Sequence, residues 1–191
     1  MLIFLYFHKI YYSLEGYLFP DTYAIENNLT NVLVLATNFV DFKNEEFPNS
    51  VKIYANQKVG YVSREHILRN IDWLSNYKII IPEAIGSGDM TKDRLKPIIV
   101  GANTCCTETY LLIGPFKDET ETQNVYTYMQ TRFFHLMLGL KKVTQHTTSK
   151  VYQFVPLQDF SKPWTDEELY AKYGLTEDEI AFIESMIRPM E

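Results

Sequence analysis

A ten-residue segment in the second half of the sequence carries side chains suited to DNA binding. Residues 141–150 contain three lysines, several neutral groups that can hydrogen-bond, and no acid. Lysines can bind phosphates, while amide, imidazole and hydroxyl groups can reach base edges in the major groove. We therefore expect DNA contacts from Lys141, Lys142, Thr144, Gln145, His146, Thr147, Thr148 and Lys150. The alternative is a solvated loop whose lysines interact favourably with the dipole of the preceding helix.

A second basic segment lies upstream, after the turn-forming sequence Gly86-Ser-Gly88. We expect a loop there, because paired glycines interrupt regular structure. This loop would present Lys92, Arg94 and Lys96 as a further DNA-binding patch. The alternative is an ordinary surface loop, since Asp89 and Asp93 reduce its positive charge.

One pattern suggests hydrolysis instead of binding. Pro20-Asp21, followed after a hydrophobic stretch by Asp41-Phe-Lys43, matches the Pro-Asp and acid-x-Lys arrangement of magnesium-dependent nucleases. Asp21 and Asp41 would hold the metal, and Lys43 would orient the attacking water. The pattern has few fixed residues and no clearly placed third acid, so a chance match in surface loops is the competing interpretation. A small nuclease is the alternative function.

The charge distribution bears on the choice between these functions. The net charge of −6 disfavours a nucleic-acid partner at first sight. The excess lies entirely in residues 151–191, which carry 9 acidic and 3 basic groups, while residues 1–150 are neutral overall. A neutral region with clustered cations is compatible with DNA binding. Most acids of the tail lie at predicted helix N-termini, where the helix dipole stabilises them.

Several other functional classes lack their sequence signals. Gly86-Ser-Gly88 has neither the further glycine of a dinucleotide fingerprint nor the Gly-Lys of a P-loop. The adjacent Cys105 and Cys106 suit neither a structural disulfide nor, by themselves, a zinc site. The longest apolar run, Met1–Phe7, is far shorter than the roughly 20 residues that span a bilayer. We expect a cytoplasmic protein with no cofactor, no metal and no membrane partner.

The elements that must position the basic segments follow from hydrophobic periodicity and capping signals. They predict a mixed α/β fold, with a twisted, largely antiparallel sheet packed by one long helix and followed by a C-terminal helical pair. Capping boxes are expected at Thr120–Gln123, Thr165–Glu168 and Thr176–Glu179, and the long helix extends from the first of these to Leu140. Strands are expected at 1–12, 31–40, 51–55 and 77–81, with 97–100 and 109–113 as a strand pair, and a three-turn helix is expected after Ser63. We place a domain at residues 1–160 and a helical appendage at 161–191.

Several ungapped blocks between about residues 50 and 190 resemble one protein family, in the order that the family has them. They include residues 58–64 (KVGYVSR), 77–82 (YKIIIP), 143–146 (VTQH), 154–160 (FVPLQDF), 164–170 (WTDEELY) and 173–184 (YGLTEDEIAFIE). Over about residues 50–190 the chain resembles the C-terminal target-recognition region of adenine-specific (N6) DNA methyltransferases from bacterial type II restriction–modification systems.

The resemblance implies a role without catalysis. Such methyltransferases carry an Asn/Asp-Pro-Pro-aromatic motif and a glycine-rich S-adenosylmethionine loop, and this sequence has neither. The chain would therefore recognise a specific DNA sequence without transferring a methyl group by itself. The implied partners are double-stranded DNA and the methyltransferase domain of the parent enzyme, together with a nuclease domain where the parent enzyme has one.

Overall fold

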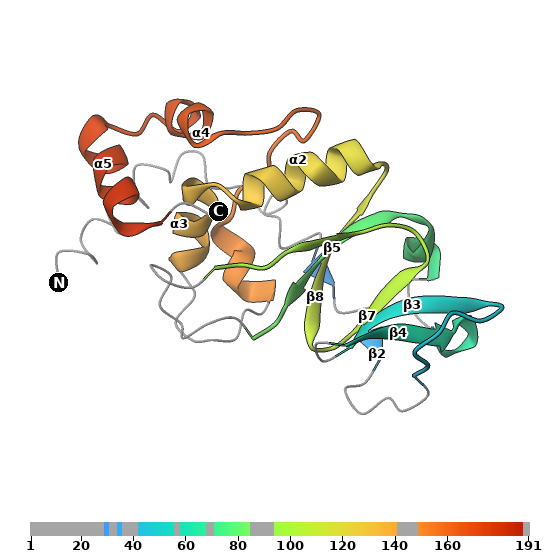
Figure 1. The fold of residues 1–191 in the computed structure, drawn as a ribbon. Coiled ribbons are helices and arrows are strands. Elements are labelled where there is room, and N and C mark those ends of the chain that lie inside the picture. Colours follow the sequence, from blue (N-terminus) through green and yellow to red (C-terminus); the bar gives the residue numbers. More distant parts are fainter. Residues whose placement is uncertain are drawn as a thin grey trace. The chain divides into compact units, whose positions relative to one another are not determined.

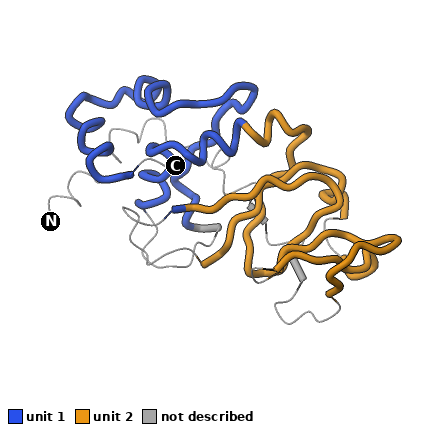
Figure 2. The backbone as a smooth tube through the Cα atoms, viewed as in Figure 1, with its two compact units in different colours: residues 1–27, 85–94, 124–191 blue, residues 28–84, 95–123 orange. Residues whose placement is uncertain are grey.

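The computed structural model describes residues 29–30, 34–35, 42–55, 58–67, 71–84, 94–140 and 149–188. Contacts divide the chain into two compact units (Figure 2). Unit 1 comprises residues 1–27, 85–94 and 124–191, and unit 2 comprises residues 28–84 and 95–123. This division crosses the helix that contains residue 124, whereas we expect from the sequence a boundary after residue 160.

The first sheet of unit 2 is antiparallel throughout (Figure 1). Its strand order is β1 (Leu29–Thr30), β8 (Tyr110–Phe116), β5 (Tyr77–Pro82) and β6 (Ile98–Val100). Strands β6 and β8 both pair with β5, so the expected strand pair 97–100 and 109–113 is wrong as a direct pairing. Strand β8 also continues beyond residue 113, where the expected strand ends, because a register shift between Tyr77 and Ile79 of β5 lets Phe116 pair with Tyr77.

The second sheet of unit 2 is mixed. Its order is β2 (Val34–Leu35), β7 (Thr104–Thr107), β3 (Ser50–Ala55) and β4 (Lys58–Ser63). Strands β3 and β4 form an antiparallel hairpin, and β7 pairs in parallel with both β2 and β3. The mixed α/β class is confirmed, with the strands arranged in two sheets where we expect one. The expected strands 1–12 and most of 31–40 lie outside the described residues.

Two short 3₁₀ helices stand where the sequence predicts one three-turn helix. They are η2 (Arg64–His66) and η3 (Ile71–Ser75). Ser63 does cap η2, accepting a hydrogen bond from the Glu65 amide at 3.4 Å. The helix prediction is wrong because Ile67 adopts an extended conformation with ψ 98° and ends the turn. Ile67 and Leu74 are both buried in the core, whereas Ile71 at the start of η3 is 48% exposed.

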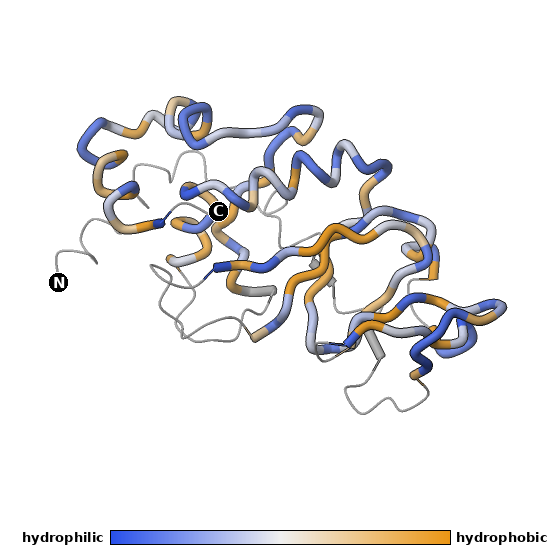
Figure 3. The backbone as a smooth tube through the Cα atoms, viewed as in Figure 1, coloured by the Kyte–Doolittle hydropathy of each residue, from blue (hydrophilic) through white to orange (hydrophobic). Residues whose placement is uncertain are grey.

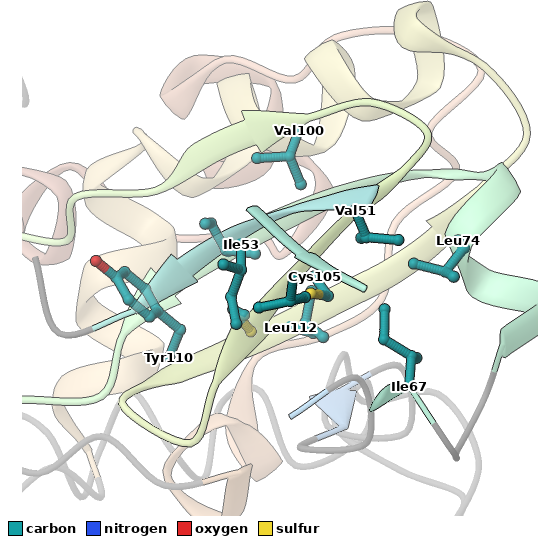
Figure 4. Close-up of a cluster of buried hydrophobic side chains, with 11 residues drawn as sticks. Val51, Ile53, Ile67, Leu74, Val100, Cys105, Tyr110 and Leu112 are labelled. Carbon is teal, nitrogen blue, oxygen red and sulfur yellow. The ribbon is translucent and has the colours of Figure 1, made fainter. Parts of the chain in front are cut away.

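The core of unit 2 is formed by side chains from both sheets and from the 3₁₀ turns (Figure 4). Many of these side chains come from hydrophobic stretches of the strands (Figure 3). Its buried members are Val51, Ile53, Val62, Ile67, Leu74, Ile80, Val100, Cys105, Cys106, Tyr110 and Leu112. Burial raises the pKa of the Cys105 thiol to about 12, and that of Cys106 further. Both thiols are therefore neutral core groups at ordinary pH.

A fully buried lysine joins two turns of unit 2. The Lys78 ammonium on β5 donates hydrogen bonds to the carbonyl oxygens of Trp73 at 2.9 Å, Asn76 at 2.9 Å and Gly101 at 3.4 Å. Three acceptors satisfy the three N–H bonds of an ammonium group, which a buried cation requires. The lysine thereby ties the turn before β5 to the turn after β6.

Unit 1 is built mainly from helices. They are α2 (Glu119–Met129), which begins in unit 2, α3 (Arg132–Gly139), η4 (Ser149–Phe154), α4 (Asp166–Lys172) and α5 (Glu177–Met186). The capping boxes at Thr165 and Thr176 are confirmed, each with both reciprocal hydrogen bonds. The box at Thr120 is wrong, since the Asp118 carboxylate accepts from the Glu121 amide at 2.8 Å and caps α2 instead. No described helix is both long and apolar enough to cross a membrane.

The expected long helix is interrupted at Thr131, and its interruption has a local cause. Thr131 is extended and caps α3, accepting from the Phe134 amide at 3.1 Å. The Asp166 carboxylate accepts from the amides of Arg132 at 3.0 Å and Phe133 at 2.9 Å. Three amides of the first turn of α3 are thus satisfied by side chains, which stabilises the start of a new helix at this point.

Candidate nucleic-acid interface

The register of the β3–β4 hairpin sets a row of side chains across three neighbouring backbone segments. Tyr61 of β4 is opposite Lys52 of β3. On its other side Tyr61 is opposite Lys43, with reciprocal backbone hydrogen bonds of 2.8 and 2.9 Å. Opposite residues of antiparallel segments place their side chains on the same face. Lys43, Tyr61 and Lys52 therefore share one face, and we call them the lysine–tyrosine row.

In the part of the chain that the structure describes, the side chains of this row are at least partly exposed and accessible to a partner. Lys43 is exposed, Lys52 and Tyr61 are half-buried, and neighbouring Val59 is 48% exposed. The Lys52 ammonium lies 5.7 Å from the centroid of the Tyr54 ring. Such cation–π contacts orient a lysine without neutralising its charge. The face can thus offer cations to phosphate groups, with aromatic surface between them.

Gly60 allows the outer lysine to reach this position. A side chain at Gly60 would collide with the Phe42 ring and with the Lys43 carbonyl oxygen. Because glycine lacks Cβ, the segment of Phe42 and Lys43 can lie directly against β4 and extend the sheet by one bridge. The Lys43 ammonium then lies 4.4 Å from the centroid of the Phe47 ring.

An open hollow of about 630 Å³ lies at the end of this hairpin. Its lining includes Glu46, Phe47, Asn49, Ser50, Arg64 and Asn103. Two of these residues have left-handed backbones, Asn49 with φ 62° and Asn103 with φ 57°, a conformation that asparagine adopts more readily than most residues.

Hydrogen bonds fix the walls of the hollow. The Arg64 amide donates to the Asn49 carbonyl at 3.0 Å, and the Asn103 side-chain amide donates to the Ser50 carbonyl at 2.9 Å. The Phe47 amide donates to Ser50 Oγ at 3.2 Å. These bonds hold the backbone of the exposed loop while its polar side chains remain at the surface.

The structure describes only part of the DNA-binding residues expected from sequence. Arg94 and Lys96 are exposed and flank the buried Leu95, just before β6. Lys150 lies in η4. Outside the described residues lie Lys92, Lys141, Lys142, Thr144, Gln145, His146, Thr147 and Thr148.

The nuclease pattern is likewise described only in part. Asp21 and Asp41 lie outside the described residues, while Lys43 belongs to the lysine–tyrosine row. Among the described side chains, no group of three or more His, Cys, Asp or Glu residues could hold a metal ion. The nuclease interpretation therefore stays a prediction.

Sequence reasoning missed the hairpin face and the hollow. Lys52 and Tyr54, like Val59 and Tyr61, are two residues apart, which places each pair on one face of its strand. That alternation could have indicated the face. No comparable pattern in the sequence indicates that Lys43 pairs with Tyr61, because this pairing depends on which segment of the chain packs against Gly60.

No family model, curated protein or solved structure matches the chain. The resemblance to adenine-specific DNA methyltransferases therefore stays a prediction from sequence. The chemistry of the lysine–tyrosine row and the hollow supplies the basis for a function.

Proposed function

We propose that the chain is a non-catalytic, sequence-specific DNA-binding module. It serves as the target-recognition part of an adenine-specific DNA methyltransferase in a restriction–modification system. The observation that carries the proposal is the lysine–tyrosine row, in which Lys43 and Lys52 flank Tyr61 on one accessible face.

The spacing of this row suits a phosphate backbone. Neighbouring strands lie 4.7–4.9 Å apart, so the backbones of Lys43 and Lys52 are separated by about 10 Å. Flexible lysine side chains on such a base can reach different phosphates of one duplex. Phosphate contacts of this kind fix the position of a protein on DNA.

The acidic tail does not oppose this role, because much of its charge has a structural use. Glu168 and Glu179 complete capping boxes, and Asp166 caps α3. Carboxylates at helix N-termini interact with amides and the helix dipole. The net charge of the chain is therefore a poor guide to the charge of the hairpin face.

Further parts of the proposal rest on the sequence resemblance. Double-stranded DNA is the proposed partner, and the methyl-transferring domain comes from the parent enzyme. The basic segments around Lys96 and at 141–150 would add contacts to those of the hairpin. A bacterial cytoplasm is the compartment in which such an enzyme meets its DNA.

Salt-dependent titrations with duplex DNA test the proposal. Each lost phosphate contact reduces the slope of log K against log salt by about 0.9. We expect this change for Lys43→Ala and for Lys52→Ala, with equal weakening on all DNA sequences. Lys117→Ala, a change at another exposed lysine of unit 2, is the matched control and should leave the slope unaltered.

Two results would contradict the proposal. Equal slopes for wild type and both row variants would remove the hairpin face from the interface. Cleavage of supercoiled plasmid with Mg²⁺, abolished by Asp41→Ala, would favour the nuclease instead.

A further inference from the structure

We propose that Arg64 and Glu46 together recognise one G·C base pair through the major groove. The inference rests on the proposed function and specifies which base pair the module selects at one position of its site. It is carried by the hollow beside the lysine–tyrosine row, which these two side chains line together.

Both side chains are available to a ligand. Arg64 and Glu46 are exposed, and within the described residues neither side chain forms an ion pair or hydrogen bond. The amide nitrogen of Asn103, by contrast, is engaged by the Ser50 carbonyl. The hollow thus presents the Arg64 guanidinium as a hydrogen-bond donor and the Glu46 carboxylate as an acceptor. Its backbone is held in place by the hydrogen bonds described above.

The hollow adjoins the cations that would position it on DNA. Phe47 forms part of its lining, and the Lys43 ammonium lies 4.4 Å from the centroid of that ring. A lysine bound to phosphate would therefore bring the exposed loop of Glu46 and Asn49 close to the duplex. Phosphate contacts fix the register in which neighbouring side chains read bases.

The two side chains match the hydrogen-bonding pattern of a G·C pair. In the major groove guanine offers its N7 and O6 as acceptors, and the paired cytosine offers its N4 amino group as a donor. The Arg64 guanidinium can donate to both guanine atoms. The Glu46 carboxylate can accept from cytosine N4. An A·T pair would present an amino group to the arginine and a carbonyl and methyl group to the carboxylate.

The presence of opposite charges around one hollow also argues against a simple phosphate site. A carboxylate that lines the same hollow as the arginine repels phosphate and weakens anion binding. A G·C pair offers acceptors to the Arg64 guanidinium and a donor to the Glu46 carboxylate. A phosphate has acceptors only and could bind only the guanidinium. The G·C edge therefore explains why an acid and an arginine line the same hollow.

Selection from randomised duplexes, followed by titration of the preferred duplex, tests this inference. For the whole chain we expect one G·C position at which Arg64→Ala loses preference on the order of 10- to 100-fold, with little change on random DNA. Replacing that guanine by 7-deazaguanine removes its N7 acceptor. It should weaken the wild type and leave Arg64→Ala unaffected. Glu46→Gln should relax the preference at the same position.

Controls and outcomes separate this inference from the proposed function. Arg188→Ala, at an exposed arginine of unit 1, should keep the full preference. Unchanged unfolding temperatures would show that the variants fold. If Arg64→Ala weakens all duplexes equally, or alters no position, Arg64 does not read a base and the inference fails while the proposed function stands. If the wild type selects no sequence, both fail.

Discussion

The buried Lys78 shows how a single side chain can make the stability of unit 2 depend on pH. Removing its ammonium from water lowers the pKa from 10.5 to about 8, although three carbonyl groups accept its hydrogen bonds. The Cys105 thiol has the opposite shift, since burial raises its pKa from 9.0 to about 12. These groups titrate in different pH windows and with opposite effects on folding.

We therefore predict a stability maximum near pH 9. Between pH 8 and 9 the unfolded chain binds more protons than the folded chain at Lys78, so the free energy of unfolding rises with pH. Above pH 9 the unfolded thiols of Cys105 and Cys106 ionise while the folded ones stay protonated, so the free energy falls.

Chemical denaturation across this pH range measures both effects. Lys78→Met should abolish the rise and retain the fall, and it should cost about 1–3 kcal/mol near pH 8 because carbonyl acceptors lose their donor. A rise that persists in Lys78→Met would assign the dependence to another group. A flat profile in the wild type would contradict the role of Lys78.

At the scale of elements, Asp166 links two helices. It lies in the first turn of α4, yet its carboxylate accepts from the amides of Arg132 and Phe133 at the start of α3. Arg132 in turn donates through Nε to the Ile187 carbonyl at 3.1 Å, at the end of α5. The C-terminal helical pair is therefore joined to α3 through polar contacts as well as packing.

Asp166→Ala should destabilise unit 1. Two helix-terminal amides would lose their acceptor, at a cost of about 1–3 kcal/mol. Denaturant unfolding followed by tryptophan fluorescence measures this change, since Trp164 lies next to α4 and is buried. Glu167→Ala, at the exposed neighbour, is the control and should change stability by less than about 0.5 kcal/mol. Equal effects of the two substitutions would show that the Asp166 contacts add nothing.

At this scale, features whose partners are close in sequence could be predicted, and features that depend on distant residues could not. The boxes at Thr165 and Thr176 could be predicted because all their partners lie within three residues. The break at Thr131 could not, because part of its stabilisation comes from Asp166, 35 positions away. Strand β4 and the short β7 escaped prediction, since their membership of a sheet depends on pairing with β3.

At the scale of the whole molecule, the helix-capping charges and the cations of the proposed DNA-binding hairpin occupy different stretches of the chain. Acids of unit 1 such as Glu168 and Glu179 cap helices, while Lys43, Lys52 and Arg64 of unit 2 lie on or beside one hairpin. The net charge of −6 averages over both groups and hides the hairpin cations. The distribution of charge along the sequence indicated DNA binding, but it pointed to segments 86–96 and 141–150. That Lys43 and Lys52 share one face of the hairpin follows only from the strand register of the structure.

Lysine footprinting of the whole chain tests the central claim most directly. The protein is treated with an amine-acetylating reagent in the presence and absence of saturating duplex DNA, and mass spectrometry measures the modification of each lysine. We predict that DNA protects Lys43 and Lys52, while Lys117 is modified equally in both samples. Protection at Lys96, Lys141 and Lys142 would add the segments expected from sequence to the same interface. Equal modification of Lys43 and Lys52 with and without DNA would contradict the claim that this hairpin binds DNA.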